Sequence, residues 1–286
     1  MNRLKSMFIG IYPMLAMGIA GYGIYRMTQY GFDMGWLGAT LTTMPVMVFI
    51  GRIMMFKNTA RTSAHFPMIT LAAIVGLGLA IADFFHSSMA QAEALIAAIS
   101  GFVTYMAYNF WFSKLGRSRN PQLQQGSALP SFSAIDASGE EFTSDSLIGK
   151  PAVLIFFRGN WCPLCMAQIK EVAAQYRELA KHGVTVALIS PQPEKNTQEL
   201  AARFDVPFLF LTDRENRAAR TLGIEMKNGL PAGMEMLGYD KDTVLPTVIV
   251  TDAAGRILYL DETNNYRIRP EPEEYIKVLD AHLQSV

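Results

Sequence analysis

The chain has 286 residues, enough for one or two domains, and its 25 Lys and Arg residues balance 25 Asp and Glu. This balance gives no sign of the basic surface that nucleic acids require, so we expect no nucleic-acid partner. The charges are unevenly distributed, since residues 1–112 contain six Lys or Arg and three Asp or Glu. The sequence therefore predicts two chemically different parts.

Four apolar segments with few charges make up the N-terminal part. Each is long enough to cross the hydrocarbon core of a bilayer, which takes roughly 20 helical residues. The segments are residues 6–25, 34–51, 62–82 and 94–113. A cleavable signal peptide has a single apolar core, so this set predicts a domain of four transmembrane helices over residues 1–115, with the lipid bilayer as its surroundings.

Basic residues at the ends of these segments predict the orientation, because Lys and Arg near span ends are retained on the cytoplasmic side. They precede the first segment, fill the loop between the second and third, and follow the fourth, whereas the opposite side has only Arg26. The residues concerned are Arg3, Lys5, Arg52, Lys57, Arg61, Lys114, Arg117 and Arg119. We expect an integral protein of a bacterial-type inner membrane with a cytoplasmic C-terminal part.

Residues 116–130 are rich in polar residues, Gly and Pro, which predicts a linker. From residue 131 to 286, strand and helix patterns alternate after a leading hairpin at 132–143. We expect strands at 152–157, 184–190, 208–211, 246–251 and 256–260, and helices at 166–180, 194–204, 214–223 and 270–282. This order predicts an α/β domain around a single mixed sheet.

The only two cysteines, Cys162 and Cys165, lie where the predicted strand 152–157 gives way to a helix. Pro163 suits the first helical position, where its missing N–H costs nothing. Free N–H groups at a helix N-terminus stabilise an anion, and a thiol pKa near 8.5 can fall there to about 3.5–7.5. We therefore expect Cys162 to be the thiolate that attacks, and Cys165, on the same helix face, to form the disulfide with it.

Two other roles for the pair are weaker. A structural zinc site takes four ligands, and the C-terminal part adds only His182 and His282 to the cysteines. A structural disulfide closing so short a loop would constrain little of the unfolded chain. A redox-active pair without metal or cofactor remains, and Arg158 either lowers a thiol pKa by its charge or points to solvent from the strand end.

Three blocks of the C-terminal part are similar to the thioredoxin-fold superfamily, and specifically to the peroxiredoxin-like (redoxin) branch related to alkyl hydroperoxide reductase and thiol-specific antioxidant proteins. The blocks begin at "LPSFSAIDASGEEFT", "VALISPQPEKNTQEL" and "LPTVIVTDAAGRILYL", and the resemblance covers residues 128–284. It implies that Pro246 is a cis-proline beside the active cysteine and that the Leu245 backbone pairs with an extended substrate. It also suggests Arg269 as a cation near the thiolate, the alternative being a surface Arg beside "EPEE".

The sequence departs from this branch at the peroxide pocket. Typical members have PxxxTxxC, whereas Ile155 and Gly159 occupy the Pro and Thr positions here, and Trp161 next to Cys162 resembles thioredoxin. We expect a membrane-anchored antioxidant enzyme that reduces peroxides with electrons from a thioredoxin- or glutathione-like thiol donor. The alternatives are a thiol-disulfide oxidoreductase acting on a protein partner, and a membrane transporter or sensor regulated by a redox domain.

Overall fold

The computed structural model describes residues 2–86 and 92–283, and the chain separates into two compact units. One unit contains Leu4–Lys57 and Thr62–Lys114, and the other contains Met1–Arg3, Asn58–Arg61 and Leu115–Val286. The last residues of the expected domain 131–286, from 284 onwards, lie outside the described residues. The short segment Asn58–Arg61, from the loop after the second helix, thus belongs with the α/β unit.

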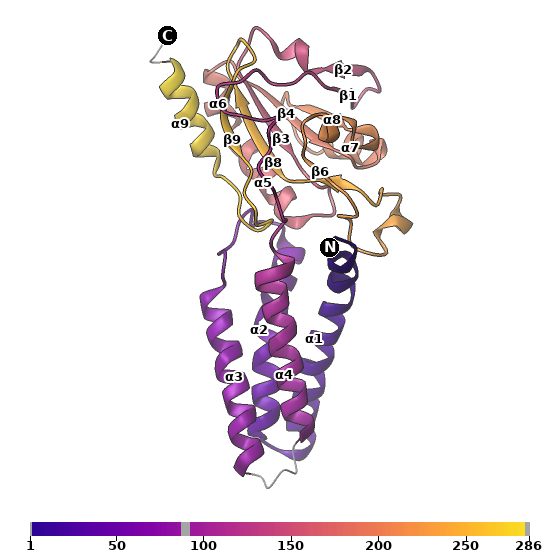
Figure 1. Ribbon diagram of the computed structural model, residues 1–286, viewed down its shortest axis with the longest axis vertical. Coiled ribbons are helices and arrows are strands. Elements are labelled where there is room, and N and C mark those ends of the chain that lie inside the picture. The colour runs from indigo at the N-terminus through magenta and orange to yellow at the C-terminus, as the bar shows by residue number, and fades with distance from the viewer. Residues whose placement is uncertain (1, 87–91, 284–286) are drawn as a thin grey trace. The chain divides into compact units, whose positions relative to one another are not determined.

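The helical unit contains the four long apolar helices that the sequence predicts (Figure 1). They are α1 (Asn2–Tyr30), α2 (Met34–Phe56), α3 (Pro67–His86) and α4 (Ala92–Met106), which continues as the π-helix η1 (Ala107–Phe112). All four are long and apolar enough to cross a membrane, judged by length and composition.

Small residues let these helices approach closely, as is usual where lipid provides no hydrophobic drive for association. Gly38 of α2 faces the Gly76 carbonyl of α3, and neither glycine has room for a Cβ atom. Gly101 of α4 packs in the same way against Thr42 of α2. Helix α1 contributes Tyr12, whose ring stacks on Tyr108 of η1 with 5.3 Å between centroids.

The α/β unit is built on a seven-stranded sheet in the order β2-β1-β5-β4-β3-β8-β9 (Figure 1). Its strands are β1 (Ser133–Asp136), β2 (Glu141–Thr143), β3 (Ala152–Phe156), β4 (Thr185–Ser190), β5 (Leu209–Thr212), β8 (Thr247–Thr251) and β9 (Ile257–Asp261). Strands β3, β4 and β5 are parallel, and the remaining neighbours pair antiparallel. The expected mixed sheet is confirmed, and all five residues of the central strand β3 are buried.

A second, two-stranded sheet was not predicted. It pairs β6 (Glu225–Met226) with β7 (Thr243–Val244) antiparallel. Strands of two residues are too short to show the alternation by which a strand is recognised in a sequence. This sheet nevertheless matters for the site, because β7 leads directly to Leu245 and Pro246.

The helices of this unit are α5 (Pro163–Ala174), α6 (Tyr176–Lys181), α7 (Glu194–Ala201), α8 (Arg217–Thr221) and α9 (Pro272–Leu283), with 3-10 turns η2 (Ser144–Leu147), η3 (Arg214–Asn216) and η4 (Met234–Leu237). The single helix expected at 166–180 is interrupted at Gln175, which has φ −95° and ψ 10°. The helix expected at 214–223 starts later, because Asn216 has a left-handed φ of 54°. The Asp213 carboxylate then caps α8 by accepting from the N–H groups of Ala218 and Ala219, at 2.8 and 2.9 Å.

Part of the segment expected to be a linker packs against the α/β unit. Leu123 is 2% exposed and belongs to the core cluster that includes Leu154 and Phe156 of β3. The Asn120 side chain donates to the Leu222 carbonyl at 2.8 Å, and the Gly126 N–H donates to the Ile257 carbonyl at 2.7 Å. The polar composition of residues 116–130 therefore reflects specific hydrogen bonds as well as solvent exposure.

Candidate active site

The cysteine pair lies at the corner between β3 and α5. Cys162 is the N-cap of α5, with φ −83° and ψ 108°, and Pro163 begins the helix. The Cys162 Sγ accepts a hydrogen bond from the Cys165 N–H at 3.3 Å, so one of the free N–H groups at the helix start is directed at this sulfur. Both thiols are free, and Cys162 is 3% exposed while Cys165 is fully buried.

The turn before the pair explains why Gly159 stands at the Thr position of PxxxTxxC. Gly159 has φ +140°, a backbone conformation that favours glycine. A Cβ atom here would lie 2.8 Å from two indole atoms of Trp161. The Trp161 ring therefore occupies the space that a side chain at position 159, such as Thr, would need.

Arg269 is brought to the cysteine pair from the segment between β9 and α9. Its side chain is 5% exposed, and its Nη2 lies 3.6 Å from the Cys165 Sγ. Of the two roles considered from the sequence, the structure places Arg269 in the interior beside a thiol. It contacts Cys165, whereas the resemblance suggested only a cation near the attacking thiolate.

Arg158 also points inward. It is 7% exposed, its guanidinium carbon lies 4.8 Å from the Trp161 ring centroid, and it donates to the Gly229 carbonyl. Burial lowers the pKa of Arg158, and the negative charges of Cys162 and Cys165 oppose this shift. A buried guanidinium is therefore balanced in part by the thiolate charge of the pair.

The two thiols are hydrogen-bonded to each other, and their pKa values move in opposite directions. For Cys165, burial raises the pKa, but the hydrogen bond from Cys162 and the charge of Arg269 outweigh it, so the pKa falls from 9.0 to about 6. The pKa of Cys162 is raised well above 9.0 by the hydrogen bond to Cys165, by burial and by the Cys165 charge. The charge of Arg269 acts to lower the pKa of both thiols, and the expectation that Cys162 is the attacking thiolate stays a prediction.

Pro246 and Leu245 differ from what the resemblance implied. The described residues contain no cis peptide bond, so the bond between Leu245 and Pro246 is trans, the form that X-Pro bonds favour by about 0.5–1 kcal/mol. The Leu245 N–H already donates to the Ile224 carbonyl at 2.8 Å, and its carbonyl accepts from Thr247 Oγ1 at 2.8 Å. The Leu245 backbone therefore has internal partners at both of its polar groups.

Arg117 is a residue of this region whose place the sequence did not reveal. Its side chain is 6% exposed and pairs with Glu262 at 3.3 Å. It also donates to the Pro246 carbonyl and, at 2.9 Å, to Thr247 Oγ1. In the sequence, Arg117 served as one of the basic residues that predict the orientation of the apolar segments. Nothing marked it as part of the α/β unit.

No group of three or more His, Cys, Asp or Glu residues is placed to hold a metal ion within residues 2–86 and 92–283. The groups that meet at the candidate site are two thiols and two buried guanidinium groups.

Comparison with known proteins agrees with this geometry. The model of the AhpC/TSA family matches residues 125–260. These residues form an AhpC/TSA family domain. The match begins after the four apolar helices, and it confirms the expected peroxiredoxin-like, thioredoxin-fold domain and the class of thiol oxidoreductase.

Relatives of the AhpC/TSA domain include peroxiredoxins and a thiol-disulfide oxidoreductase. These names correspond to the two enzyme activities that we considered from the sequence. Chloroplastic peroxiredoxin Q of Sedum lineare is 27% identical over 129 residues, which are 44% of this chain and 69% of that protein. The putative peroxiredoxin bcp of Coxiella burnetii is 27% identical over 124 residues, 43% of this chain and 81% of that protein. The thiol-disulfide oxidoreductase ResA of Geobacillus thermodenitrificans is 27% identical over 131 residues, 46% of this chain and 70% of that protein.

Solved structures similar to this chain include peroxidoxin BcpB from Mycobacterium tuberculosis and a thiol peroxidase from Chromobacterium violaceum. The first is 20% identical with a TM-score of 0.46, and covers 56% of this chain and 97% of its own. The second is 17% identical with a TM-score of 0.47, and covers 60% of this chain and 96% of its own.

Proposed function

We propose that the protein is a membrane-anchored thiol oxidoreductase that reduces peroxides through Cys162 and Cys165. The observation that carries the proposal is a hydrogen-bonded dithiol that is almost completely buried and has the Arg269 guanidinium 3.6 Å from one sulfur. With 3% of Cys162 exposed, the site favours a small oxidant over the disulfide of a folded protein. The AhpC/TSA match supports the same chemistry.

The hydrogen bond between the two thiols suggests the first step. Cys162 is the less buried sulfur, so it meets the peroxide, and the Cys165 thiolate accepts its proton as a general base. The resulting Cys162 thiolate attacks one peroxide oxygen, the O–O bond breaks, and Cys162 becomes a sulfenic acid. The departing alkoxide takes the proton from Cys165 and leaves as an alcohol, or as water from hydrogen peroxide.

The second step closes the disulfide. The Cys165 thiolate, formed again in the first step, attacks the sulfenic sulfur of Cys162 and expels hydroxide, which solvent protonates to water. Two thiols are thereby oxidised while one peroxide is reduced. Arg158 and Arg269 supply fixed positive charge in a water-poor site, where it stabilises the anions formed in both steps.

Return to the dithiol requires an electron donor. A thioredoxin- or glutathione-like thiolate attacks the Cys162–Cys165 disulfide, and a second thiol releases the donor as a disulfide. The membrane anchor and the cytoplasmic side of the AhpC/TSA domain belong to this proposal. They are supported by the four apolar helices and by the basic residues that flank them.

The direct test is stopped-flow oxidation of the reduced full-length protein in detergent by hydrogen peroxide and by an alkyl hydroperoxide. We expect a second-order rate constant well above that of free cysteine, and its loss in Cys162→Ser. A rate no better than free cysteine for either oxidant would refute peroxide reduction.

Disulfide exchange with a partner is a second candidate, because the Trp161 ring occupies the space that a side chain at position 159 would need and because its position before CPLC is similar to thioredoxin. In that case Cys165→Ser would leave Cys162 as a mixed disulfide with the partner, since the sulfur that releases it is gone. Recovery of such a species from cells expressing this variant, combined with slow peroxide oxidation of the unmodified protein, would favour exchange over peroxide reduction.

A further inference from the structure

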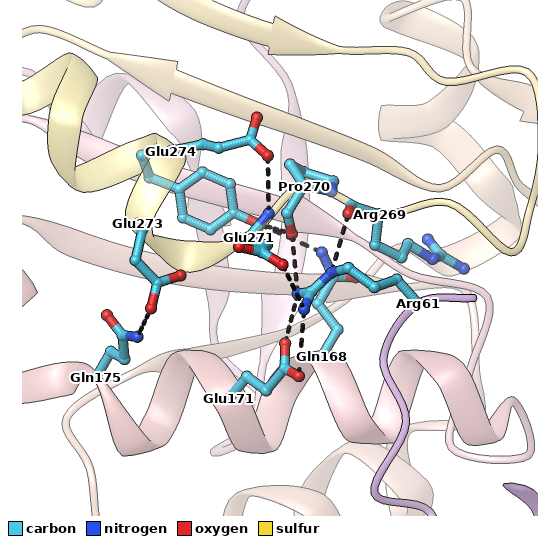
Figure 2. Close-up of polar contacts among 10 residues, drawn as sticks. Arg61, Gln168, Glu171, Gln175, Arg269, Pro270, Glu271, Glu273 and Glu274 are labelled. Carbon is cyan, nitrogen blue, oxygen red and sulfur yellow. Dashed lines mark hydrogen bonds and ion pairs between the residues drawn. The ribbon is translucent and has the colours of Figure 1, made fainter. Parts of the chain in front are cut away.

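Arg61 lies in the loop that joins α2 to α3 in the sequence, yet the segment Asn58–Arg61 packs as part of the α/β unit. Its guanidinium is bonded to the two elements that build the candidate active site, the segment Arg269–Glu271 and helix α5 (Figure 2). Nothing in the sequence distinguishes this arginine from the other basic residues that flank the apolar segments.

The first set of contacts holds the backbone on which Arg269 sits. The Arg61 Nε donates to the Arg269 carbonyl at 3.1 Å, and its Nη2 donates to the Pro270 carbonyl at 3.3 Å. Its Nη1 pairs with the Glu271 carboxylate at 3.5 Å. In Figure 2 the Arg269 carbonyl faces Arg61, whereas the Arg269 guanidinium points away from it.

The second set of contacts reaches α5. The Arg61 Nη2 lies 2.5 Å from one oxygen of Glu171, and its Nη1 lies 3.5 Å from the other. Such two-point pairing of a guanidinium with a carboxylate fixes direction as well as distance. Glu171 lies less than two turns after Cys165 on the same helix, so Arg61 connects the Arg269 backbone to the helix that carries the thiol.

The connection that Arg61 makes matters because few contacts hold the Arg269 side chain itself. Its Nη2 contact with the Cys165 Sγ is 3.6 Å long, and its Nε has no hydrogen-bond partner among the described residues. Another bridge between the segment and α5 is neutral: Gln168 donates to the Tyr275 hydroxyl at 3.3 Å, and this hydroxyl donates to the Pro270 carbonyl at 3.4 Å. Charge-assisted bonds are roughly twice as strong as neutral ones.

We propose that Arg61 is a positioning residue that clamps the segment Arg269–Glu271 to α5 and so holds the Arg269 guanidinium beside the Cys165 thiol. This proposal deepens the proposed function: the clamp has a role in catalysis only if the cysteine pair reduces peroxides as proposed above. It adds a residue from the membrane part of the sequence to the machinery of the AhpC/TSA domain.

A double-mutant cycle in the reduced full-length protein tests whether Arg61 acts through Arg269. The readout is the pH midpoint of the ultraviolet absorbance of the thiolate, which needs no turnover and so remains informative if the protein does not reduce peroxides. Arg269→Gln should raise the midpoint by about 1–3 pH units, the usual effect of a close opposite charge. Arg61→Gln should raise it by part of this amount, and Arg61→Gln in the Arg269→Gln background should add nothing. Additive shifts, or an unchanged midpoint in Arg61→Gln, would overturn the proposal.

Glu171→Gln separates positioning from simple charge. Removing a carboxylate near a thiol lowers the thiol pKa by charge alone, whereas loosening the clamp moves Arg269 away and raises it. We expect the midpoint to rise, and a fall would contradict the proposal. The matched control is Arg214→Gln, which breaks an exposed ion pair with Glu194 of 2.5 Å elsewhere on the domain and should leave the midpoint unchanged.

Discussion

Arg269 lies beside Cys165, with its Nη2 3.6 Å from the Cys165 Sγ. The cation thus lies beside the fully buried thiol, where its charge helps to lower the pKa of Cys165, while the hydrogen bond to Cys165 and burial raise the pKa of Cys162. This arrangement makes Cys165 more than the partner that closes the disulfide. In the mechanism that we propose, Cys165 holds the negative charge at rest and is the base that activates Cys162.

The first prediction concerns the pH dependence of reactivity. The Cys165 pKa of about 6 implies that the pair carries its negative charge at neutral pH and loses it as the pH falls through about 6. Peroxide oxidation of the reduced full-length protein should therefore slow as the pH falls through this value. A rate profile with its midpoint near 9 would show that Arg269 does not stabilise the thiolate.

The second prediction is a pH dependence of stability. In the unfolded chain Cys165 keeps its proton up to about 9, whereas in the folded protein it has lost it above about 6. Stability of the reduced protein should therefore rise from pH 6 to 9, and this contribution should be lost as the pH falls back to 6. Urea unfolding of the full-length protein, followed by near-ultraviolet circular dichroism, measures the slope. The Cys165→Ser variant should lack this rise in stability between pH 6 and 9. An equal slope in that variant would mean that other titrating groups cause it.

The third prediction concerns the glycine before the pair. Gly159→Thr should not restore the peroxiredoxin pocket, because φ +140° and the Trp161 ring both oppose a side chain there. We expect a loss of roughly 1–3 kcal/mol from backbone strain, and a further loss from the overlap with the indole.

Gly139→Thr is the matched control for this substitution. Gly139 has φ +94° but nothing within 4 Å of a Cβ atom, so it reports strain without overlap. Thermal unfolding should show the larger loss at position 159. Equal losses at the two sites would mean that the Trp161 ring moves aside readily.

The fourth prediction concerns the reduction potential. Oxidation to the disulfide removes the negative charge that balances buried Arg158 and Arg269, so the structure favours the dithiol form. Arg158→Gln should therefore make the potential more negative, by about 30 mV for each tenfold change in the equilibrium with glutathione. Redox titration of the full-length protein measures this value, with Arg214→Gln as the exposed control. A more positive potential in Arg158→Gln would contradict the charge argument.

The sequence predicts the elements whose patterns are local. The four long apolar segments predict the four long helices, and the continuous apolar run predicts the buried strand β3. The proline directly after Cys162 predicts the start of α5. The resulting corner, with two cysteines at a helix N-terminus, therefore follows from the order of residues alone. Elements of two or three residues, such as β6 and β7, have no such pattern.

The arrangement of charge around the pair depends on contacts between distant parts of the chain. Arg269 is separated from Cys165 by 104 positions, and Arg61 from Glu171 by 110. Local sequence cannot show which sulfur a distant cation approaches, so helix position alone favoured Cys162 as the thiolate. The same limit applies to Arg117, whose partner Glu262 lies 145 positions away.

The central claim is that Cys162 is oxidised by peroxide and that Cys165 then closes the disulfide. It is tested most directly by adding one equivalent of hydrogen peroxide to the reduced full-length protein and mapping the products by peptide mass spectrometry. We predict loss of both thiols to a Cys162–Cys165 disulfide, and in Cys165→Ser a sulfenic acid on Cys162 that dimedone captures. Unchanged thiols, or in Cys162→Ser a sulfenic acid formed on Cys165 at the unmodified rate, would contradict the account.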